Sequence, residues 1–453
     1  MHVTMKRKSH LQRELRLVVD AIGWFRLLFW LPLIIGKRFV RGILKNIYKQ
    51  ERQSLHNGSQ FELEDKERLR VMFVASDNSA ASGAFRSMTT LATLLRGRHG
   101  IDAFVVLPYS GNGTELLKEN SIPHAFVNSA DWTIPKDSNP KEWKRSHEIV
   151  SRAVGNHFAI SILRDLIRRN HVDIVHVNTT WTYVGALAAL SEGVPFVWHL
   201  REFLEEDQGR TIWSRYEGNT LIAASNAAIA ISESMVNKYA PFVPAKRLVK
   251  IWNGIDETRC VVRERQCFDR MPYIFVLLGN FRRHKGHLEF SQACAMLYRR
   301  GVRNFKVWFV GEGDTGVKEE CLSILSAAGM SELEVTCWGF QKSPEKILAQ
   351  ADVAFMCSRA EAFGRVTVEA MMSGCLVVGA DTAATKELIK NGKTGILYHY
   401  SNGDVNALVE KMQLVISSPR QMREIASNGL NYALKNFTAT RNAIEIAALY
   451  NSL

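Results

Sequence analysis

Short apolar runs alternate with longer segments of helical periodicity over most of this chain of 453 residues. The runs in the first half are rich in Val, Ile, Phe and Ala: Leu69–Ser76, Ala103–Pro108, Val172–Asn178, Pro195–Leu200 and Ala227–Ser232. Segments with helical spacing lie between them: Ser87–Arg98, Ser146–Arg169 and Val184–Glu192. This alternation predicts βαβ units and a parallel sheet that helices cover on both faces.

A second series of the same kind begins after Asn253-Gly254-Ile255-Asp256. Its strand-like runs are Tyr273–Leu278, Lys306–Val310, Glu334–Trp338, Val353–Cys357 and Cys375–Gly379. Its helical segments are Glu289–Arg300, Val317–Ala328, Pro344–Ala349 and Val366–Ser373. The predicted fold class is therefore α/β, with two tandem Rossmann-like, doubly wound domains.

The predicted domain organisation has six parts. They are a basic, partly apolar segment (1–52), a polar linker (53–68), a first Rossmann-like domain (69–256), a hinge (257–270), a second Rossmann-like domain (271–435), and a C-terminal helix that returns to the first domain (436–453).

Most of the formal charge of +13 lies at the N-terminus. Residues 1–52 contain twelve Lys and Arg against three Asp and Glu, a net charge of +9, which leaves +4 for the other 401 residues. The remainder shows no basic stripe with interleaved aromatic residues, so nucleic acid is not an expected partner.

An apolar stretch of fifteen residues, Ala21–Ile35, lies within this basic segment. It is shorter than the roughly 20 residues of a spanning helix, and Arg26 and Pro32 interrupt it. Basic flanks together with Trp24 and Trp30 favour contact with an anionic membrane surface. A cleaved signal peptide and a helix packed on the protein's own core are the alternatives. We expect a peripheral or monotopic protein at the cytoplasmic face of the inner or plasma membrane.

The seven cysteines all lie between Cys260 and Cys375 and include no Cys-x-x-Cys pair. An odd number without paired spacing argues against a disulfide framework or a zinc ribbon. We interpret them as buried thiols in a reducing compartment.

A glycine motif, Gly311 to Gly316, follows the apolar run at Lys306–Val310 and matches the G-x-G-x-x-G pattern of dinucleotide sites. That pattern belongs on the first strand of its sheet, whereas Tyr273–Leu278 precedes it here. Asp314 within the loop would also repel a pyrophosphate. We therefore favour an ordinary strand-to-helix turn.

Two segments of the second half carry candidate chemistry. Gly279 to Gly286 follows a predicted strand and contains Arg282, Arg283 and Lys285, cations that suit a diphosphate. A solvated basic loop is the alternative.

The other segment places Glu361 after a predicted strand and Glu369 eight residues later, in a predicted helix. Gly364 near the helix start lets backbone N–H groups face a phosphate. The apolar surroundings predict that a polyhydroxy ligand partners the two carboxylates, with Glu369 on a ribose and Glu361 on sugar hydroxyls.

These motifs resemble the family 4 (group 1) glycosyltransferases, which are retaining GT-B enzymes with sugar-nucleotide donors. The Glu361/Glu369 segment, with Phe363-Gly364 and a following Glu-Ala-Met run, is similar to the family's paired-glutamate motif. Asn253 to Asp256 is similar to its N-G-[VI]-D sequence. Gly279 to Gly286 is similar to its G-R-x(n)-K-G sequence. Asn280 departs from that pattern, which has Arg after the first glycine, so Arg282 or Arg283 must take that role.

The resemblance implies roles for single residues. His199, Glu361 and Lys285 would be catalytic, with His199 near the reacting sugar; without the family, a satisfied core histidine is the simpler interpretation of His199. His176 is predicted to be structural. The implied donor-binding residues are Gly83, Arg282, Arg283, Lys285, Phe340, Glu361, Phe363, Gly364, Arg365 and Glu369.

The predicted function is transfer of a sugar from a nucleoside diphosphate sugar to an acceptor hydroxyl, with retention of configuration. The expected acceptor is a saccharide or lipid-linked saccharide of the cell envelope. No cofactor is expected, and the cations would replace a metal. A sugar-nucleotide epimerase or phosphorylase, and a non-catalytic nucleotide-binding scaffold on a membrane, are the alternatives.

Overall fold

A computed structural model describes residues 68–137, 143–261, 263 and 266–453. The predicted membrane-contacting segment at 1–52 and nearly all of the linker lie outside the described residues. Among the residues that are described, no helix is long and apolar enough to cross a bilayer.

The chain divides into two compact units. Unit 1 runs to Ala230 and also contains Lys238–Lys250 and Ala443–Leu453. Unit 2 contains Ile231–Asn237 and Ile251–Asn442. The last helix therefore begins in unit 2 and places its last residues in unit 1.

Unit 1 is built on a parallel sheet of seven strands in the order β3-β2-β1-β5-β6-β8-β9. The strands are β1 (Arg70–Val74), β2 (Asp102–Leu107), β3 (His124–Phe126), β5 (Ile174–Asn178), β6 (Phe196–Leu200), β8 (Ala227–Ala230) and β9 (Leu248–Lys250). The order reverses direction between β1 and β5. In doubly wound sheets, ligands bind beyond the carboxyl ends of the strands at such a switch point.

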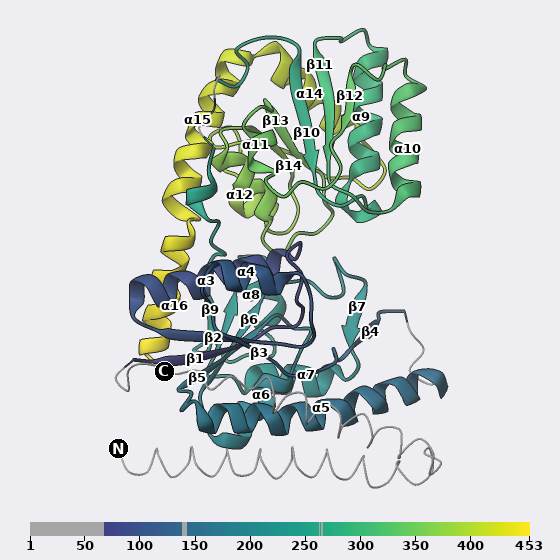
Figure 1. The fold of residues 1–453 in the computed structure, drawn as a ribbon. Coiled ribbons are helices and arrows are strands. Elements are labelled where there is room, and N and C mark those ends of the chain that lie inside the picture. The colour runs from purple at the N-terminus through teal and green to yellow at the C-terminus, as the bar shows by residue number, and fades with distance from the viewer. Residues whose placement is uncertain (1–67, 138–142, 262, 264–265) are drawn as a thin grey trace. The chain divides into compact units, whose positions relative to one another are not determined.

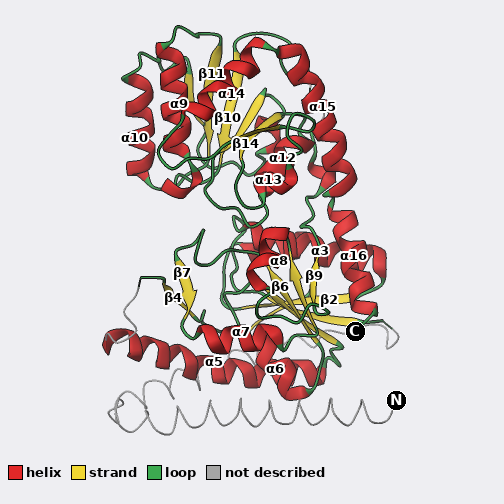
Figure 2. Ribbon diagram, turned by 180° about the vertical axis from the view of Figure 1, so that it is seen from behind, coloured by secondary structure: helices red, strands yellow, loops and turns green. Residues whose placement is uncertain are grey.

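Helices cover both faces of this sheet, with α3 on one face and α5 and α6 on the other (Figure 1; Figure 2). The helices of this part of the chain are α3 (Gly83–His99), α4 (Gly113–Glu119), α5 (Trp143–Arg169), α6 (Val184–Glu192), α7 (Arg215–Ala223) and α8 (Glu233–Tyr239). The central strands are buried along their whole length, which explains why they read as continuous apolar runs.

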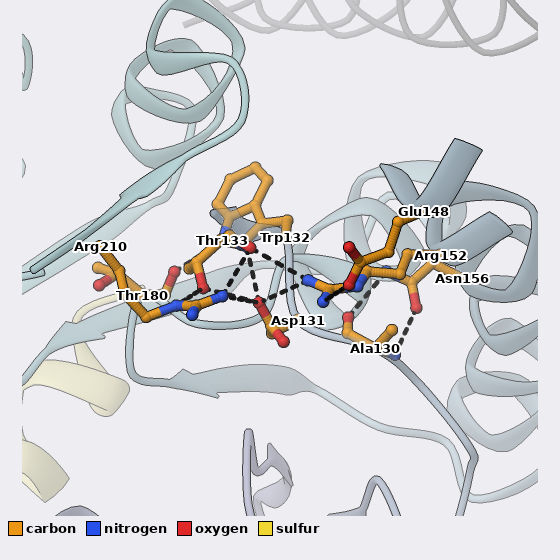
Figure 3. A network of polar contacts seen from close by, with 9 residues as sticks. All are labelled: Ala130, Asp131, Trp132, Thr133, Glu148, Arg152, Asn156, Thr180 and Arg210. Atoms are coloured by element: carbon orange, nitrogen blue, oxygen red, sulfur yellow. Dashed lines mark hydrogen bonds and ion pairs between the residues drawn. The ribbon is translucent and has the colours of Figure 1, made fainter. Parts of the chain in front are cut away.

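The sequence analysis missed an antiparallel ribbon of two short strands, β4 (Thr133–Pro135) and β7 (Arg210–Ile212). A network of polar contacts fastens it to α5 and to the end of β5 (Figure 3). Asp131 accepts hydrogen bonds from Thr133 and Arg152, and the Arg210 guanidinium binds Thr133. The indole of Trp132 donates to the carbonyl of Thr180 at 2.6 Å. Three residues per strand are too few to show a period of two.

Unit 2 contains a parallel sheet of six strands in the order β12-β11-β10-β13-β14-β15. The strands are β10 (Tyr273–Leu278), β11 (Phe305–Val310), β12 (Val335–Cys337), β13 (Val353–Met356), β14 (Leu376–Ala380) and β15 (Ile396–Tyr398). Its order reverses between β10 and β13. The predicted α/β class with two doubly wound domains is confirmed.

The helices of unit 2 lie on both faces of its sheet, with α9 and α10 on one and α12 and α15 on the other (Figure 1). They are α9 (His287–Arg299), α10 (Thr315–Ser326), α11 (Glu345–Leu348), α12 (Arg365–Met372), α13 (Thr385–Leu388), α14 (Asn406–Ser417) and α15 (Pro419–Asn436). Helix α16 (Ala439–Asn451) follows. Between sheet and helices lies a core rich in aromatic residues, including Phe275, Phe290, Phe309 and Phe355.

The segment predicted as a hinge, 257–270, makes specific contacts within unit 2. The guanidinium of Arg263 donates to the carbonyls of Ala351 and Ser373, near the C-terminal ends of α11 and α12. The buried carboxylate of Asp352 accepts from the backbone N–H of Phe268 at 2.7 Å. These bonds tie the described part of the segment to the second sheet, and hinge motion there stays a prediction.

All seven cysteines are free thiols, and five of them are buried. Burial raises the pKa of the Cys357 and Cys267 thiols to about 12. These groups stay protonated and behave as small apolar side chains.

Candidate functional site

The two loops that flank the switch point of unit 2 are joined by an ion pair. Lys285 lies in the turn after β10, and Glu361 lies in the loop after β13. The Lys285 ammonium contacts a Glu361 carboxylate oxygen at 2.8 Å. The exposed fractions of the Lys285 and Glu361 side chains are 23% and 24%, so a ligand can reach the pair from solvent. The structure thus brings together the two residues that the sequence analysis assigned to catalysis in this half.

A glycine makes the Lys285 turn possible. Gly286 has φ of +78°, and a Cβ at this position would lie 2.2 Å from the carbonyl oxygen of Cys357, at the end of β13. Any other residue would push the two strand ends apart. The close approach of these two backbones sets the distance across which Lys285 reaches Glu361.

The neighbouring loops are hydrogen-bonded to one another along the same edge of the sheet. The backbone N–H of Ala384, after β14, donates to the carbonyl of Glu361 at 3.1 Å. On the other side, the N–H of Phe281 donates to Glu312 and its carbonyl accepts from Asp314, both in the glycine motif after β11. This edge is therefore a continuous frame of loops around Lys285 and Glu361.

The glycine motif serves this frame. A Cβ on Gly311 would lie 2.3 Å from the carbonyl oxygen of Gly279, and a Cβ on Gly313 would lie 2.6 Å from that of Phe281. Asp314 caps α10, because its carboxylate accepts from the N–H of Val317 at 3.2 Å. The chain's own carboxylate occupies the place where a dinucleotide would put a phosphate. These contacts agree with a strand-to-helix turn.

Helix α12 begins at this edge with no side chain capping its first turn. Its N-cap is Gly364, which is buried and has φ of +88° and ψ of +58°. The guanidinium of Arg365, the first residue of α12, contacts the carboxylate of Glu369, one turn further along the helix, at 2.9 Å. The N-terminal N–H groups of a helix favour an anion. Glu369, predicted to bind a ribose, is thus placed one turn from a phosphate-binding position.

The two candidate arginines differ in their surroundings. Arg283 forms an ion pair with Glu320 of α10 at 2.9 Å. Arg282 is exposed, and it makes no side-chain hydrogen bond or ion pair with any residue that the structure describes. Arg282 is therefore the better candidate of the two for binding a phosphate, because the Arg283 guanidinium is already paired with Glu320.

Phe363 and Phe340 lie in different environments. The Phe363 ring is buried and packs on Trp252 and Phe437, with ring centroids 6.0 and 6.2 Å away. Any donor contact from Phe363 would come from its backbone. Phe340 lies in the loop after β12 and is 52% exposed, beside the half-exposed Trp338. Both assignments to the donor site stay predictions.

Unit 1 carries a second polar edge at its own switch point. Ser76 after β1 accepts a hydrogen bond from Thr179 after β5 at 2.8 Å. Ser82 caps α3, and Gly83 is its first residue. Asp77 accepts from the Ser82 hydroxyl, and burial raises the pKa of Asp77. Gly83, one of the implied donor-binding residues, thus lies at this edge.

His199 is the last residue but one of β6 and is fully buried. Nδ1 of His199 lies 3.1 Å from Nε2 of His176. The other ring nitrogen of His199, its Nε2, has no hydrogen-bond partner among the described residues. Burial, with Arg201 as a second cause, lowers the pKa of both histidines well below the usual value. Both rings are therefore neutral.

The sequence analysis missed three polar residues at the same edge: Asn178 and Arg201, which are buried, and Glu202, which is partly buried. Asn178 accepts a hydrogen bond from Arg201 at 2.7 Å, and Glu202 accepts from the backbone and hydroxyl of Thr180. Burial raises the pKa of Glu202 to about 7, although the Thr180 hydrogen bonds oppose the shift. The sequence offered one signal for Asn178, Arg201 and Glu202: each lies at or just after the end of a predicted strand. Polar side chains at those ends face ligands rather than the core.

No group of three or more His, Cys, Asp or Glu in the described parts of the chain is arranged to hold a metal ion. Metal independence stays a prediction.

Comparison with known proteins identifies the class. The model for glycosyl transferases group 1 matches residues 262–432, and the model for glycosyltransferase family 4 matches residues 81–259. With its two doubly wound units, the chain belongs to the GT-B glycosyltransferases and is a transferase.

Particular relatives show how far the similarity extends. The alpha-maltose-1-phosphate synthase of Mycolicibacterium smegmatis is 27% identical over 310 residues, which cover 62% of this chain and 79% of the synthase. The lipopolysaccharide core mannosyltransferase LpcC of Rhizobium leguminosarum bv. viciae is 38% identical over 96 residues, 21% of this chain and 27% of that protein. The crystal structure of Anabaena HepE with UDP superimposes with a TM-score of 0.69 at 20% identity, covering 85% of this chain and all of HepE.

Glu202 gives a test of the polar edge in unit 1. Between pH 4.5 and pH 7 the folded protein keeps a proton on Glu202 that the unfolded chain releases, so this group makes the protein less stable as pH rises. Glu202→Gln is neutral at every pH and can still accept from Thr180. At pH 8 we expect the free energy of unfolding of Glu202→Gln to exceed that of wild type by up to about 3 kcal/mol, so that it unfolds at a higher temperature. At pH 4.5 the two proteins should differ little.

Glu119→Gln, at an exposed glutamate, is the matched control and should leave the pH dependence unchanged. A Glu202→Gln protein that is less stable than wild type at pH 8 would show that the ionised carboxylate is favourable there.

Proposed function

We propose that this enzyme transfers a sugar from a nucleoside diphosphate sugar to an acceptor hydroxyl with retention of configuration. The observation that carries the proposal is the Lys285–Glu361 ion pair at the switch point of unit 2, next to the uncapped first turn of α12. A cation, free backbone N–H groups and carboxylates lie at one edge of one sheet. A molecule with phosphates at one point and hydroxyls on either side matches that arrangement.

The diphosphate is assigned to Lys285, Arg282 and the first N–H groups of α12. Arg282 and Lys285 both follow β10, and Arg282 has no competing carboxylate among the described residues. The Lys285 ammonium does have a competing carboxylate, that of Glu361, with the nitrogen and oxygen 2.8 Å apart. The diphosphate would draw the ammonium away, which leaves Glu361 free to accept from the sugar hydroxyls.

The ribose is assigned to Glu369. Its carboxylate is held by Arg365 from the preceding turn, in an i, i+4 ion pair. That pair fixes one oxygen and leaves the other able to accept from a ribose hydroxyl. HepE, a solved neighbour of this fold, is known bound to UDP and to UDP-glucose. A uridine or other nucleoside diphosphate sugar is accordingly the donor class that we propose here.

The main catalytic demand is the charge that develops on the leaving diphosphate. The bond from the anomeric carbon to the diphosphate oxygen breaks, and a bond to the acceptor oxygen forms on the same face of the sugar. The acceptor proton passes to an oxygen of the departing phosphate. Lys285, Arg282 and the α12 dipole stabilise that charge. A contact of His199 with the sugar stays a prediction of the family resemblance.

The acceptor is proposed to be a saccharide or lipid-linked saccharide at the cytoplasmic face of a membrane. The support is the basic, apolar composition of residues 1–52 and the name of the Rhizobium relative, which acts in lipopolysaccharide core synthesis.

Nucleoside diphosphate release distinguishes this function from its rivals. We expect release from one of a panel of UDP-, GDP- and dTDP-sugars when membrane extract supplies the acceptor. The anomeric configuration of the product, determined by NMR, should match that of the donor. An epimerase would instead convert the sugar nucleotide, and a phosphorylase would need inorganic phosphate. No turnover of any donor would favour a non-catalytic scaffold.

Arg282 and Arg283 form a matched pair for the donor site. Arg282→Ala should weaken binding of the donor found in the panel by about tenfold or more, because a charge-assisted hydrogen bond to phosphate is lost. Arg283→Ala breaks only the ion pair with Glu320 and should change the affinity less than about twofold. Calorimetric titration measures both. Equal losses, or a larger loss for Arg283→Ala, would contradict the assignment.

Removal of residues 1–52 tests the membrane proposal. The full chain should sediment with vesicles that contain anionic lipid and much less with neutral ones, because twelve basic side chains lie in this segment. A chain that begins at Gln53 should lose both the binding and the activity on membrane acceptors. Undiminished binding and activity of the shortened chain would refute the proposal.

A further inference from the structure

Two ion pairs of opposite direction connect the same two segments of unit 2. One segment runs from the turn after β10 into the first turn of α9 and carries Lys285 and Glu289. The other is the loop after β13, which carries Arg359 and Glu361. Lys285 pairs with Glu361 at 2.8 Å, and the Arg359 guanidinium pairs with a Glu289 carboxylate oxygen at 3.3 Å. Each segment thus supplies one cation and one anion.

The two carboxylates differ in how easily they can change partners. The Glu361 side chain is 24% exposed, so water or a ligand hydroxyl can take the place of Lys285. Glu289 is buried, and its Oε2 has no hydrogen-bond partner among the described residues. If Arg359 left, the whole carboxylate of Glu289 would be buried and unpaired, which is costly. We therefore expect a ligand to separate Lys285 from Glu361 and to leave Arg359 on Glu289.

The backbone of Arg359 strengthens the second connection. Its N–H donates to the carbonyl of His284, the residue before Lys285, at 3.0 Å. Arg359 is thus bonded to the Lys285 segment by its main chain and by its side chain, only two positions before Glu361. A change in this one residue's contacts would move Glu361 relative to Lys285.

A simpler interpretation of Glu289 is that it serves its own helix. Glu289 is the acidic residue in the first turn of α9, where the helix dipole favours a negative charge. The dipole does not require an arginine partner, however. It also does not explain why that partner lies on the loop that carries Glu361. The two interpretations predict different results for ligand binding.

We propose that Arg359 and Glu289 form a clasp that holds the Lys285 and Glu361 segments together while the diphosphate of the donor displaces Lys285 from Glu361. Both are positioning residues: Arg359 acts through Glu361, which remains facing the sugar hydroxyls. The proposal rests on the proposed function for the identity of the ligand. The clasp itself lies within unit 2 and can be tested without a ligand.

Hydrogen exchange tests the clasp in the full chain without any ligand. Lys285→Ala imitates the state in which a ligand has taken the ammonium away. Glu289→Met removes the carboxylate and keeps a long, helix-favouring side chain, a kind of replacement that buried ion pairs often tolerate. We expect each single variant to speed exchange of the N–H groups of residues 358–361 by less than about twofold, and the double variant by at least about tenfold.

The reason is that either ion pair alone still joins the two segments, whereas the double variant has neither. Mass spectrometry of the peptides that contain residues 358–361 measures the rates. A double variant that exchanges no faster than the product of the two single effects would overturn the proposal.

Titration calorimetry separates positioning from a purely structural role. The probes are UDP, GDP and dTDP, each with and without attached glucose. Glu289→Met should bind the nucleotide that wild type prefers within about twofold of wild type, because Lys285 and Arg282 are intact. It should bind the glucose conjugate about tenfold more weakly, because Glu361 no longer faces the sugar hydroxyls. Equal effects on the two kinds of ligand would overturn the proposal and favour the helix-dipole interpretation.

A double-mutant cycle shows whether the effect passes through Glu361. Added to Glu361→Gln, Glu289→Met should cause no further loss of affinity for the glucose conjugate, because the side chain that the clasp positions is already changed. A further tenfold loss in that background would contradict the assigned role.

Glu192→Met is the matched control. Glu192 is 13% exposed, close to the 12% of Glu289, and it pairs with Arg164 at 2.6 Å at the end of α6 in unit 1. This variant should leave both the exchange of residues 358–361 and the ligand affinities unchanged. If wild type binds none of the six probes, the proposed donor class fails, and the exchange rates still decide whether the clasp exists.

Discussion

The ion pair between Lys285 and Glu361 is the interaction on which the proposed donor site depends. It crosses the point where the strand order of unit 2 reverses, and it exists because Gly286 lets the turn after β10 approach the end of β13. In the absence of a ligand it satisfies two half-buried charges that would otherwise be costly to hold together in one place. A diphosphate sugar offers each partner a replacement. The same contact that stabilises the empty edge therefore prepares it for the donor.

The sheet of each unit has a point where the strand order reverses, but the side chains at these two points differ in their chemistry. At its switch point unit 2 presents charged side chains that solvent can reach, which suits phosphates. Unit 1 presents groups that are less accessible: the neutral rings of His176 and His199 with lowered pKa values, the buried Arg201, and Glu202 with a pKa of about 7. At low local dielectric a hydrogen bond is stronger and an unpaired polar group is more costly.

Much of this could be predicted from the sequence, for reasons that are local. Strands that are buried on both faces produce continuous apolar runs, and β10 was predicted with its observed ends, Tyr273–Leu278. Lys285 and Glu361 could be proposed because each follows such a run. Other features have no local signal. The β4–β7 ribbon is too short to show a period, and Tyr450 meets His176 across 274 positions of the chain. The choice between Arg282 and Arg283 required Glu320, a residue on another helix.

Donor binding by a Lys285→Ala protein tests the central claim most directly. Titration calorimetry would compare it with wild type, using UDP as the probe together with the other nucleoside diphosphates. The account predicts that the nucleotide that wild type binds is bound at least tenfold more weakly by Lys285→Ala, because a cation at the phosphates is lost. Equal affinity of the two proteins for that nucleotide would contradict it.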